Sequence, residues 1–384
     1  MKRVAVIGGG PAGAFAAEKL ARSGVETVLL DEKLAWEKPC GGGLTYKAYQ
    51  RYPFLTENSH PKKFIRSMAV AAPKAGAVQW DLGHPLVIYS RFDLNQFLLE
   101  RAERARARIE KTRVLEIVRR ETSWNIRTKQ GAFEADYCII ATGGRNSFRD
   151  FGTHWTAGDA MYALGYFAPH QQEHVDIQFL PDLQGYIWVF PRCGHASVGI
   201  GAKGEPAQSL RARLERYMDE KGIPYRGAPF FAHMLPSLEG NRWRTNRVAG
   251  EGWFSVGDAA GLVDPITGEG LYYAMRSADL ATEALLDESI APALKPDAYS
   301  RALYEDFVKD LEFGATLAQR VFIGKFLFGG IPARTVQFLR LSPRFRTIVG
   351  DLVAGTQPYL DLKARLWKNL HGTLGEIVTN RLFA

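Results

Sequence analysis

The sequence predicts an α/β fold in which a parallel sheet flanked by helices is combined with an antiparallel sheet and a helical C-terminal region. An apolar run at residues 4–7, a helix-forming stretch at 11–22 and a second apolar run at 25–30 have the order of a β-α-β unit. Alternating patterns prevail over residues 159–245, which is typical of antiparallel strands. From residue 297 onward the pattern is helical and rich in aromatic side chains.

Further elements follow from the same patterns. Asp93 is a capping-type residue that begins a helix over 93–108, and a helix over 206–221 interrupts the alternating region. A later helix is expected over about 268–287. The continuous apolar run 136–141 is consistent with a central parallel strand. Other strands are expected at residues 113–118, 123–128 and 253–257.

Composition limits the class of protein. The chain has 384 residues, 46% of them hydrophobic, which suffices for a large core in one elaborate domain or two closely packed ones. Three cysteines are too few and too scattered for a disulfide framework or a zinc site, and we expect no metal. The N-terminus does not resemble a signal peptide, and no stretch reaches the roughly 18 apolar residues that span a bilayer. We therefore expect a cytoplasmic protein.

The formal net charge of +8 would suit a protein that binds nucleic acid, an anionic membrane surface or anionic cofactors, or it serves only to keep the protein soluble. No nucleic-acid-binding module accompanies it, so we expect no nucleic acid. Residues 291–384 hold 13 Lys or Arg against 8 Asp or Glu, with aromatic side chains between them. These C-terminal helices suit peripheral contact with a membrane, or they pack their aromatics internally and leave the charge in water. The oligomeric state stays open.

The segment between the first strand and the first helix reads G-x-G-x-x-G. In such a loop the first glycine makes the tight turn, the second admits a diphosphate, and the third lets helix and strand pack closely. The N–H groups that open the helix bind the phosphates, and an acid that closes the second strand accepts a hydrogen bond from a ribose. The pattern predicts dinucleotide binding. The residues concerned are Gly8, Gly10, Pro11, Ala12 and Gly13, followed by Asp31 and Glu32.

A second motif indicates which dinucleotide is bound. Residues 256–261 read VGDAAG and continue as LVDPITGEGLYYAM. This stretch resembles the second FAD fingerprint of the para-hydroxybenzoate hydroxylase-like flavoproteins, in which the aspartate binds a ribityl hydroxyl. A helix that opens at the GEG sequence directs its N–H groups at the pyrimidine end of the flavin, where reduction places negative charge. The resemblance implies FAD, bound through Gly257, Asp258, Gly268, Gly270 and Leu271.

The resemblance also implies a fold. We expect a Rossmann-type FAD-binding domain, an inserted antiparallel-sheet domain that binds substrate, and a C-terminal helical region. The expected ranges are 1–60, 88–155 and 246–290 for the FAD-binding domain, 61–87 and 156–245 for the substrate domain, and 291–384 for the helical region.

Two further positions are compared with this superfamily. Residues 141–147, ATGGRNS, occupy the place of the motif A-D-G-x-x-S. The acid that this motif uses in binding FAD or NAD(P)H is replaced by Thr142 here, beside Gly143. Arg91 matches an arginine that precedes the helix of the FAD domain. It contacts the flavin or its diphosphate, or it is a surface arginine.

The stretch KPCGGGL at residues 38–44 contains three consecutive glycines, which lose much backbone freedom on folding. We interpret them as allowing the backbone to approach the edge of the flavin ring, with Gly42, Gly43 and Leu44 as FAD contacts. Together with YIWVFP at 186–191 and the RCGHASVGIG that follows, this stretch resembles the geranylgeranyl reductase family. Members of that family are flavoproteins that saturate isoprenoid double bonds.

Three aromatic residues alternate in the YIWVFP stretch and therefore share one face of their strand: Tyr186, Trp188 and Phe190. Such a wall suits a long hydrocarbon or a planar ring laid over a flavin, and the alternative is plain sheet core. Cys40 either supplies a proton to an alkene carbon or is a small buried residue. We place Cys40, Tyr186 and Trp188 at the catalytic centre.

Three other residues invite a chemical role. Cys138 lies within an apolar strand and is interpreted as packing, and Cys193 lies in a hairpin turn as an inert thiol. His195 in the same turn is either a proton relay or, as we favour, a solvated side chain.

The sequence thus predicts an FAD-dependent reductase that transfers hydride to a carbon–carbon double bond of an isoprenoid or similar hydrophobic substrate. NAD(P)H or another electron donor reduces the FAD. A flavin-dependent aromatic hydroxylase on the same scaffold is the alternative, followed by a halogenase and by a non-catalytic flavin-bound lipid carrier.

Overall fold

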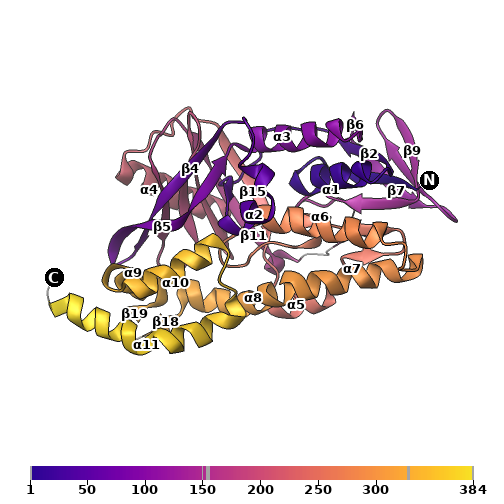
Figure 1. The fold of residues 1–384 in the computed structure, drawn as a ribbon. Helices are drawn as coiled ribbons and strands as arrows, with labels where there is room; N and C mark the ends of the chain where they lie inside the picture. Colours follow the sequence, from indigo (N-terminus) through magenta and orange to yellow (C-terminus); the bar gives the residue numbers. More distant parts are fainter. Residues whose placement is uncertain (1, 149, 153–155, 327–328, 383–384) are drawn as a thin grey trace.

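The computed structural model describes residues 2–148, 150–152, 156–326 and 329–382. Figure 1 shows an elongated molecule with one sheet at each end and the C-terminal helices along one side. One sheet is almost entirely parallel and the other is mainly antiparallel, so the predicted α/β fold class is confirmed.

The parallel sheet has six strands in the order β16-β17-β10-β1-β2-β6. Only the edge strand β16 runs antiparallel to its neighbour. The predicted central strand is β10, which pairs with β1 on one side and β17 on the other. The bounds are β1 (Arg3–Ile7), β2 (Glu26–Asp31), β6 (Arg108–Lys111), β10 (Tyr137–Ile140), β16 (Ala249–Gly250) and β17 (Trp253–Ser255).

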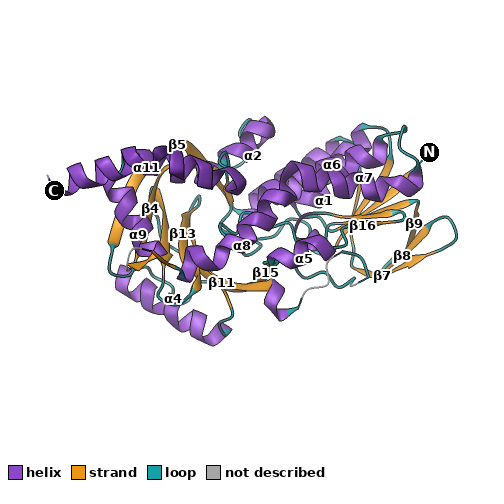
Figure 2. Ribbon diagram, turned by 90° about the horizontal axis from the view of Figure 1, so that it is seen from below, coloured by secondary structure: helices purple, strands orange, loops and turns teal. Residues whose placement is uncertain are grey.

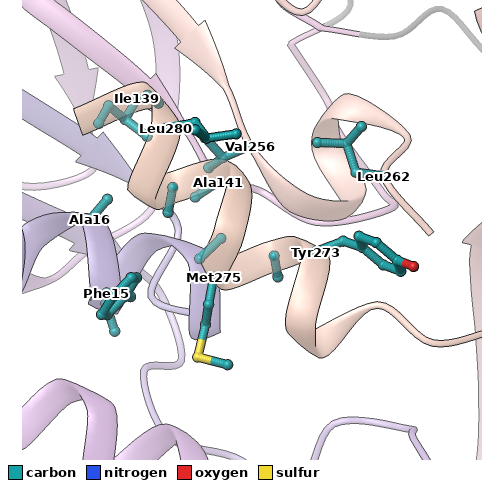
Figure 3. Packing of buried hydrophobic residues seen from close by; sticks show 14 of the residues in the cluster. Phe15, Ala16, Ile139, Ala141, Val256, Leu262, Tyr273, Met275 and Leu280 are labelled. Atoms are coloured by element: carbon teal, nitrogen blue, oxygen red, sulfur yellow. The ribbon is translucent and has the colours of Figure 1, made fainter. Parts of the chain in front are cut away.

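Helices α1 (Pro11–Arg22), α3 (Arg91–Arg104) and α6 (Leu271–Leu286) pack beside this sheet, with α1 in contact with both others. Figure 3 shows apolar side chains of α1, β10 and α6 meeting in one cluster. Helix α3 begins two residues before the predicted start, because the Oγ of Ser90 caps it by accepting the backbone N–H of Asp93 at 3.0 Å.

The second sheet has eight strands in the order β15-β11-β14-β13-β12-β4-β5-β3. The long hairpin of β4 and β5 was not predicted from the sequence. Helix α4 (Ala207–Lys221), at the predicted position, packs against one face. The bounds are β3 (Gly43–Leu44), β4 (Lys62–Ala72), β5 (Gly76–Tyr89), β11 (Ala160–Ala168), β12 (His174–Phe179), β13 (Gln184–Pro191), β14 (Ala196–Lys203) and β15 (Phe230–Pro236).

Helices form most of the chain after α6. Figure 2 shows them extending from α7, beside the parallel sheet, to α11, beside the antiparallel sheet. They are α7 (Lys295–Leu303), α8 (Lys309–Ile323), α9 (Ile331–Leu341), α10 (Pro343–Ala354) and α11 (Tyr359–Leu382), with a short hairpin of β18 (Lys325–Phe326) and β19 (Gly329–Gly330). Among the described residues, no helix is long and apolar enough to cross a membrane.

The remaining elements are short. A separate three-stranded sheet consists of β7 (Val114–Arg119), β8 (Trp124–Thr128) and β9 (Gly131–Ala135). Helix α2 (Tyr46–Arg51) follows β3, and α5 (Gly240–Thr245) follows β15.

Strand β13 separates two apolar layers. Ile187 and Val189 belong to the core that α4 covers. Trp188 belongs to a different cluster on the opposite face, where Tyr186 and Phe190 pack against it. The indole of Trp188 lies over β14, since a Cβ at Gly199 would come within 2.3 Å of its Cζ2 atom. The predicted aromatic face therefore exists, and glycines of the neighbouring strand make room for its central ring.

Gly199→Ala should destabilise the protein by about 1–3 kcal/mol, because the added methyl group overlaps the indole of Trp188 and the backbone beside it. Gly201→Ala is the matched control, since its Cβ would lie 3.3 Å from the same ring. Urea unfolding of both variants measures the difference. Equal free energies of unfolding for Gly199→Ala and the wild type would contradict this packing.

Candidate active site

The first fingerprint forms a tight loop between β1 and α1. Gly8 has a φ of 111°, which favours glycine. A Cβ at Gly13 would lie 1.9 Å from the carbonyl oxygen of Gly8, so helix α1 packs on the loop only with glycine there. A Cβ at Gly10 would meet no atom within 4 Å. The middle glycine therefore borders open space at the N-terminus of α1, where Pro11 and Ala12 are buried.

Asp31 braces this loop from the end of β2. Its carboxylate accepts the backbone N–H of Gly9 at 2.7 Å, that of Lys33 at 2.7 Å and that of Leu34 at 2.6 Å. Three of the roughly four lone-pair sites of a carboxylate are thus occupied by the protein. One lone-pair site of the carboxylate is left for the predicted hydrogen bond from a ribose hydroxyl. The side chain of Glu32 is exposed, and its carboxylate lies 3.8 Å from the guanidinium of Arg113.

The second fingerprint meets the first. Gly257 has a φ of 59°, and a Cβ there would lie 3.4 Å from the Cβ of Ala12. Asp258 lies beside the start of α6, with its Oδ1 3.4 Å from the position of a Cβ at Gly270. The predicted start of that helix was 268, whereas α6 begins at the buried Leu271. Two segments more than 240 residues apart in sequence thus border one site.

The three glycines after Cys40 contact protein groups. Cβ atoms at Gly41 and Gly43 would come within 3.2 Å and 2.8 Å of the ring of Phe190. Gly42 has a φ of 83°, and its Cβ would lie 2.1 Å from the carbonyl oxygen of Tyr89. We had attributed these glycines to the edge of a flavin ring. In the structure Phe190 and the end of β5 also occupy the space that side chains would need, and contact of these glycines with the flavin stays a prediction.

A buried arginine ties this loop to the antiparallel sheet. The guanidinium of Arg192 is fully buried, donates to the backbone carbonyls of Cys40 and Gly41, and pairs with Glu37. Ser197 on β14 also donates to the carbonyl of Cys40, at 2.8 Å. Neither Arg192 nor Glu37 was predicted from the sequence as a site residue. The only signal was a charged residue directly after the buried strand β13.

The thiol of Cys40 lies near the aromatic face. It is half-buried and accepts the backbone N–H of Gly42 at 3.3 Å. The hydroxyl of Tyr186 donates to the carbonyl of Thr267, and burial raises the pKa of Tyr186, with Cys40 among the groups that add to the effect. The Nε1 of Trp188 donates to Ser197 at 3.3 Å. The structure therefore brings together Cys40, Tyr186 and Trp188, which we had placed at the catalytic centre.

Charged groups complete the site. The ammonium of Lys38 lies 3.2 Å from Asp258. Burial alone would raise the pKa of Asp258, but the charges around it, Lys38 first among them, together outweigh burial and hold the pKa below its usual value. Burial also raises the pKa of Glu269, at the start of α6, to about 7.

Thr142, which stands in place of the expected acid, donates a hydrogen bond to Asn146 at 2.9 Å. The next residue, Gly143, has a positive φ.

His195 differs from the prediction. We had favoured a solvated turn histidine, but its ring packs edge-on against Phe167, and its Nε2 is buried without a partner among the described residues. Burial lowers its pKa. Cys138 is fully buried and Cys193 is exposed, in line with the inert roles expected for them.

A separate cavity of about 780 Å³ opens between α1, α2 and α6. Charged side chains such as Lys19, Arg51 and Asp279 line it, and neither Cys40 nor Trp188 does. It does not match the apolar chamber expected for a hydrocarbon.

The chain is similar to proteins of known function. A model of the pyridine nucleotide-disulphide oxidoreductase family matches residues 2–154. The chain is 33% identical to the chloroplastic geranylgeranyl diphosphate reductase of Oryza sativa subsp. japonica over 328 residues, or 74% of this chain and 66% of that relative. It is 28% identical to the menaquinone reductase of Mycobacterium tuberculosis, across 98% of this chain and 97% of that protein.

The chain belongs to the geranylgeranyl reductase family of FAD-dependent oxidoreductases. The crystal structure of a geranylgeranyl bacteriochlorophyll reductase-like protein from Thermoplasma acidophilum has the same fold. Its TM-score is 0.78 at 21% identity, over 96% of this chain and 98% of that one. The resemblance predicted from the sequence is therefore confirmed.

The site of this geranylgeranyl reductase family member fits FAD. Gly10 leaves room for a diphosphate, and α1 and α6 both direct their N-termini at the site. Arg91 is buried, not at the surface; it bonds to Asn95 at 3.3 Å, and its Nε has no partner among the described residues. A buried donor of this kind needs an acceptor, and a phosphate oxygen would be one.

Gly10→Ala should leave the apoprotein as stable as the wild type, because the methyl group meets no protein atom. It should weaken FAD binding at least tenfold, since the methyl group fills the space beside the phosphates. Thermal unfolding and FAD titration measure the two effects, with the exposed Gly375→Ala as control. Unchanged FAD affinity would place the diphosphate elsewhere.

Proposed function

We propose that this protein transfers hydride from reduced FAD to a carbon–carbon double bond of an isoprenoid or similar hydrophobic substrate. The observation that supports this most is the position of the aromatic face of β13 next to Cys40 and to Thr267 and Gly268 of the second fingerprint. The relatives named for reducing geranylgeranyl diphosphate and menaquinone support the substrate class. The redox chemistry comes from the bound FAD, with NAD(P)H or another donor as reductant.

The proposed site residues are those predicted from the sequence. The loop at Gly8 to Gly13, Asp31, Arg91, Asp258 and the start of α6 hold FAD. Tyr186 and Trp188 orient the hydrocarbon and exclude water, because Trp188 is buried, Tyr186 is half-buried, and their rings meet edge to face at a centroid distance of 6.3 Å. We also propose the predicted three-part division into domains.

Cys40 is proposed as the proton donor. Its thiol is one of the groups that act electrostatically on Tyr186. Its hydrogen bond, among the described residues, is with the backbone N–H of Gly42 and not with a side chain. Hydride arrives at one alkene carbon, and the S–H bond of Cys40 breaks as its proton moves to the neighbouring carbon. The thiolate is then reprotonated from solvent.

Anaerobic reoxidation tests the function. Protein with chemically reduced FAD is mixed without oxygen with geranylgeranyl diphosphate, and in a second arm with menaquinone. The proposal predicts substrate-dependent return of the oxidised flavin spectrum and a product whose isoprenoid chain is heavier by two hydrogens. A gain of two hydrogens on the ring of menaquinone alone is reduction of the quinone and counts against the proposal. If neither substrate reoxidises the flavin, and oxygen with an aromatic substrate gives a hydroxylated product, the monooxygenase alternative is correct.

Cys40→Ser should retain FAD but slow that reoxidation by about 10²–10⁴-fold, because a hydroxyl is a far weaker acid than a thiol. Cys193→Ser, at an exposed position, is the matched control and should react like the wild type. Stopped-flow absorbance measures both rates. Equal rates for Cys40→Ser and the wild type would leave Cys40 as a packing residue.

We further propose that helix α11 contacts an anionic membrane. Leu360, Trp367, Leu374 and Val378 recur at helical spacing and are 42%, 65%, 43% and 59% exposed. Figure 1 shows this helix along the outer edge of the molecule. Exposed lysines such as Lys363 and Lys368 accompany this apolar stripe, as on helices that lie in a membrane interface.

Trp367→Glu should reduce binding to vesicles that contain phosphatidylglycerol by about ten- to a hundredfold, because burial of such a side chain contributes about 1.5–3 kcal/mol. Thr379→Glu adds the same charge at another exposed position of α11 and should have a small effect. Co-sedimentation measures binding. Wild-type protein that stays in solution, or that forms dimers through α11 in ultracentrifugation, would contradict membrane contact.

A further inference from the structure

Lys38 joins three segments of the site. Its ammonium lies 3.2 Å from the Oδ2 of Asp258, and the two side chains are 18% and 14% exposed. The same ammonium lies 3.7 Å from the position that a Cβ at Gly143 would take. Because Lys38 precedes Cys40 by two residues, it connects the Cys40 loop to the second fingerprint and to the loop after β10.

His233 on β15 lies near the same charges. It pairs in register with Ala163, which belongs with Trp188 to the apolar cluster on the inner face of the sheet. Opposed residues of antiparallel strands point to the same face, so His233 lies on that face as well. The Nε2 of His233 is buried and has no hydrogen-bond partner among the described residues.

The electrostatic surroundings keep this imidazole neutral. Burial, followed by the charge of Lys38, lowers the pKa of His233 to about 3. Arg145 and Arg91 act in the same direction, and Asp258 acts against them. Lys38 and Arg91 are the partly buried and buried cations that act on His233, and Asp258 is the carboxylate that acts against them. An excess of positive charge in a poorly solvated site is costly without a counter-ion, and the diphosphate of FAD carries two negative charges.

We propose that Lys38 and His233 are two further FAD-contacting residues of this protein. The ammonium of Lys38 balances negative charge on the cofactor while it holds the Cys40 loop against Asp258. The free ring nitrogen of His233 makes its missing hydrogen bond to the cofactor. This inference rests on FAD binding, which family membership shows, and not on the identity of the alkene.

The charge of Lys38 has a consequence for reduction. Two-electron reduction adds negative charge to the flavin at neutral pH, so a nearby cation stabilises the reduced form more than the oxidised form. Removal of Lys38 also leaves the carboxylate of Asp258 without its partner, which disfavours negative charge on the cofactor further. Both effects lower the midpoint potential of the flavin.

The test compares Lys38→Met, Lys38→Arg and Lys33→Met. Titration should show that Lys38→Met binds FAD at least tenfold more weakly than the wild type. The midpoint potential of the bound flavin should fall by about 30 mV for each tenfold by which binding of reduced FAD is weakened more than binding of oxidised FAD. Lys38→Arg keeps the charge and should restore most of both values. Lys33→Met removes an exposed charge in the same loop, over the ring of Trp36, and should change neither.

His233→Leu should also bind FAD at least tenfold more weakly, and His233→Gln, which keeps a hydrogen-bonding group, should bind more tightly than His233→Leu. The ratio of wild-type to His233→Leu affinity should stay constant between about pH 5 and pH 9, because the imidazole is neutral throughout this range. Wild-type FAD affinity and potential in Lys38→Met would overturn the role of Lys38. Wild-type affinity in His233→Leu, or a ratio that changes with pH, would overturn that of His233.

Discussion

The guanidinium of Arg192 is buried at the junction of the two sheets, and the arrangement of the site depends on how it is satisfied. A buried charge is tolerated only with good partners, and Arg192 has the carboxylate of Glu37 and the carbonyls of Cys40 and Gly41. Arg192 directly follows β13, whereas the acceptors precede β3. The ion pair thus fixes Cys40 at the end of the aromatic strand. Glu37 also accepts the backbone N–H of Arg91 at 2.9 Å, which links the start of α3 to the same network.

The glycines of the site differ in what a side chain at each position would meet. Gly13, Gly42 and Gly43 are required by protein atoms, because a Cβ at each would overlap a carbonyl group or the ring of Phe190. Gly10 meets no protein atom within 4 Å, and it borders the space in which we propose that the diphosphate binds.

Local patterns predicted much of this molecule. The strand before Gly8, helix α1 and strand β2 were predicted because a β-α-β unit is encoded by periodicity over fewer than 30 residues. The two fingerprints predicted FAD, which family membership supports. The alternation in β13 predicted the shared face of Tyr186 and Trp188.

Contacts between segments that lie far apart in the chain could not be predicted from local sequence patterns. The partners of Arg192 lie more than 150 residues away, and the ion pair of Lys38 with Asp258 spans 220. His195 and His233 look like ordinary polar residues in a turn and a strand, and their buried, unpartnered nitrogens appear only after the sheet has formed around them. The contact of the glycine run with Phe190 was hidden for the same reason.

A crystal structure of the protein grown with FAD tests the central claim most directly. We predict one FAD with its diphosphate at Gly10, its ribityl chain at Asp258 and its isoalloxazine ring in contact with the segment from Cys40 to Gly43. Trp188 should lie on the substrate side of that ring. An FAD bound outside the two fingerprints, or a ring that touches neither Cys40 nor the aromatic face of β13, would contradict the account.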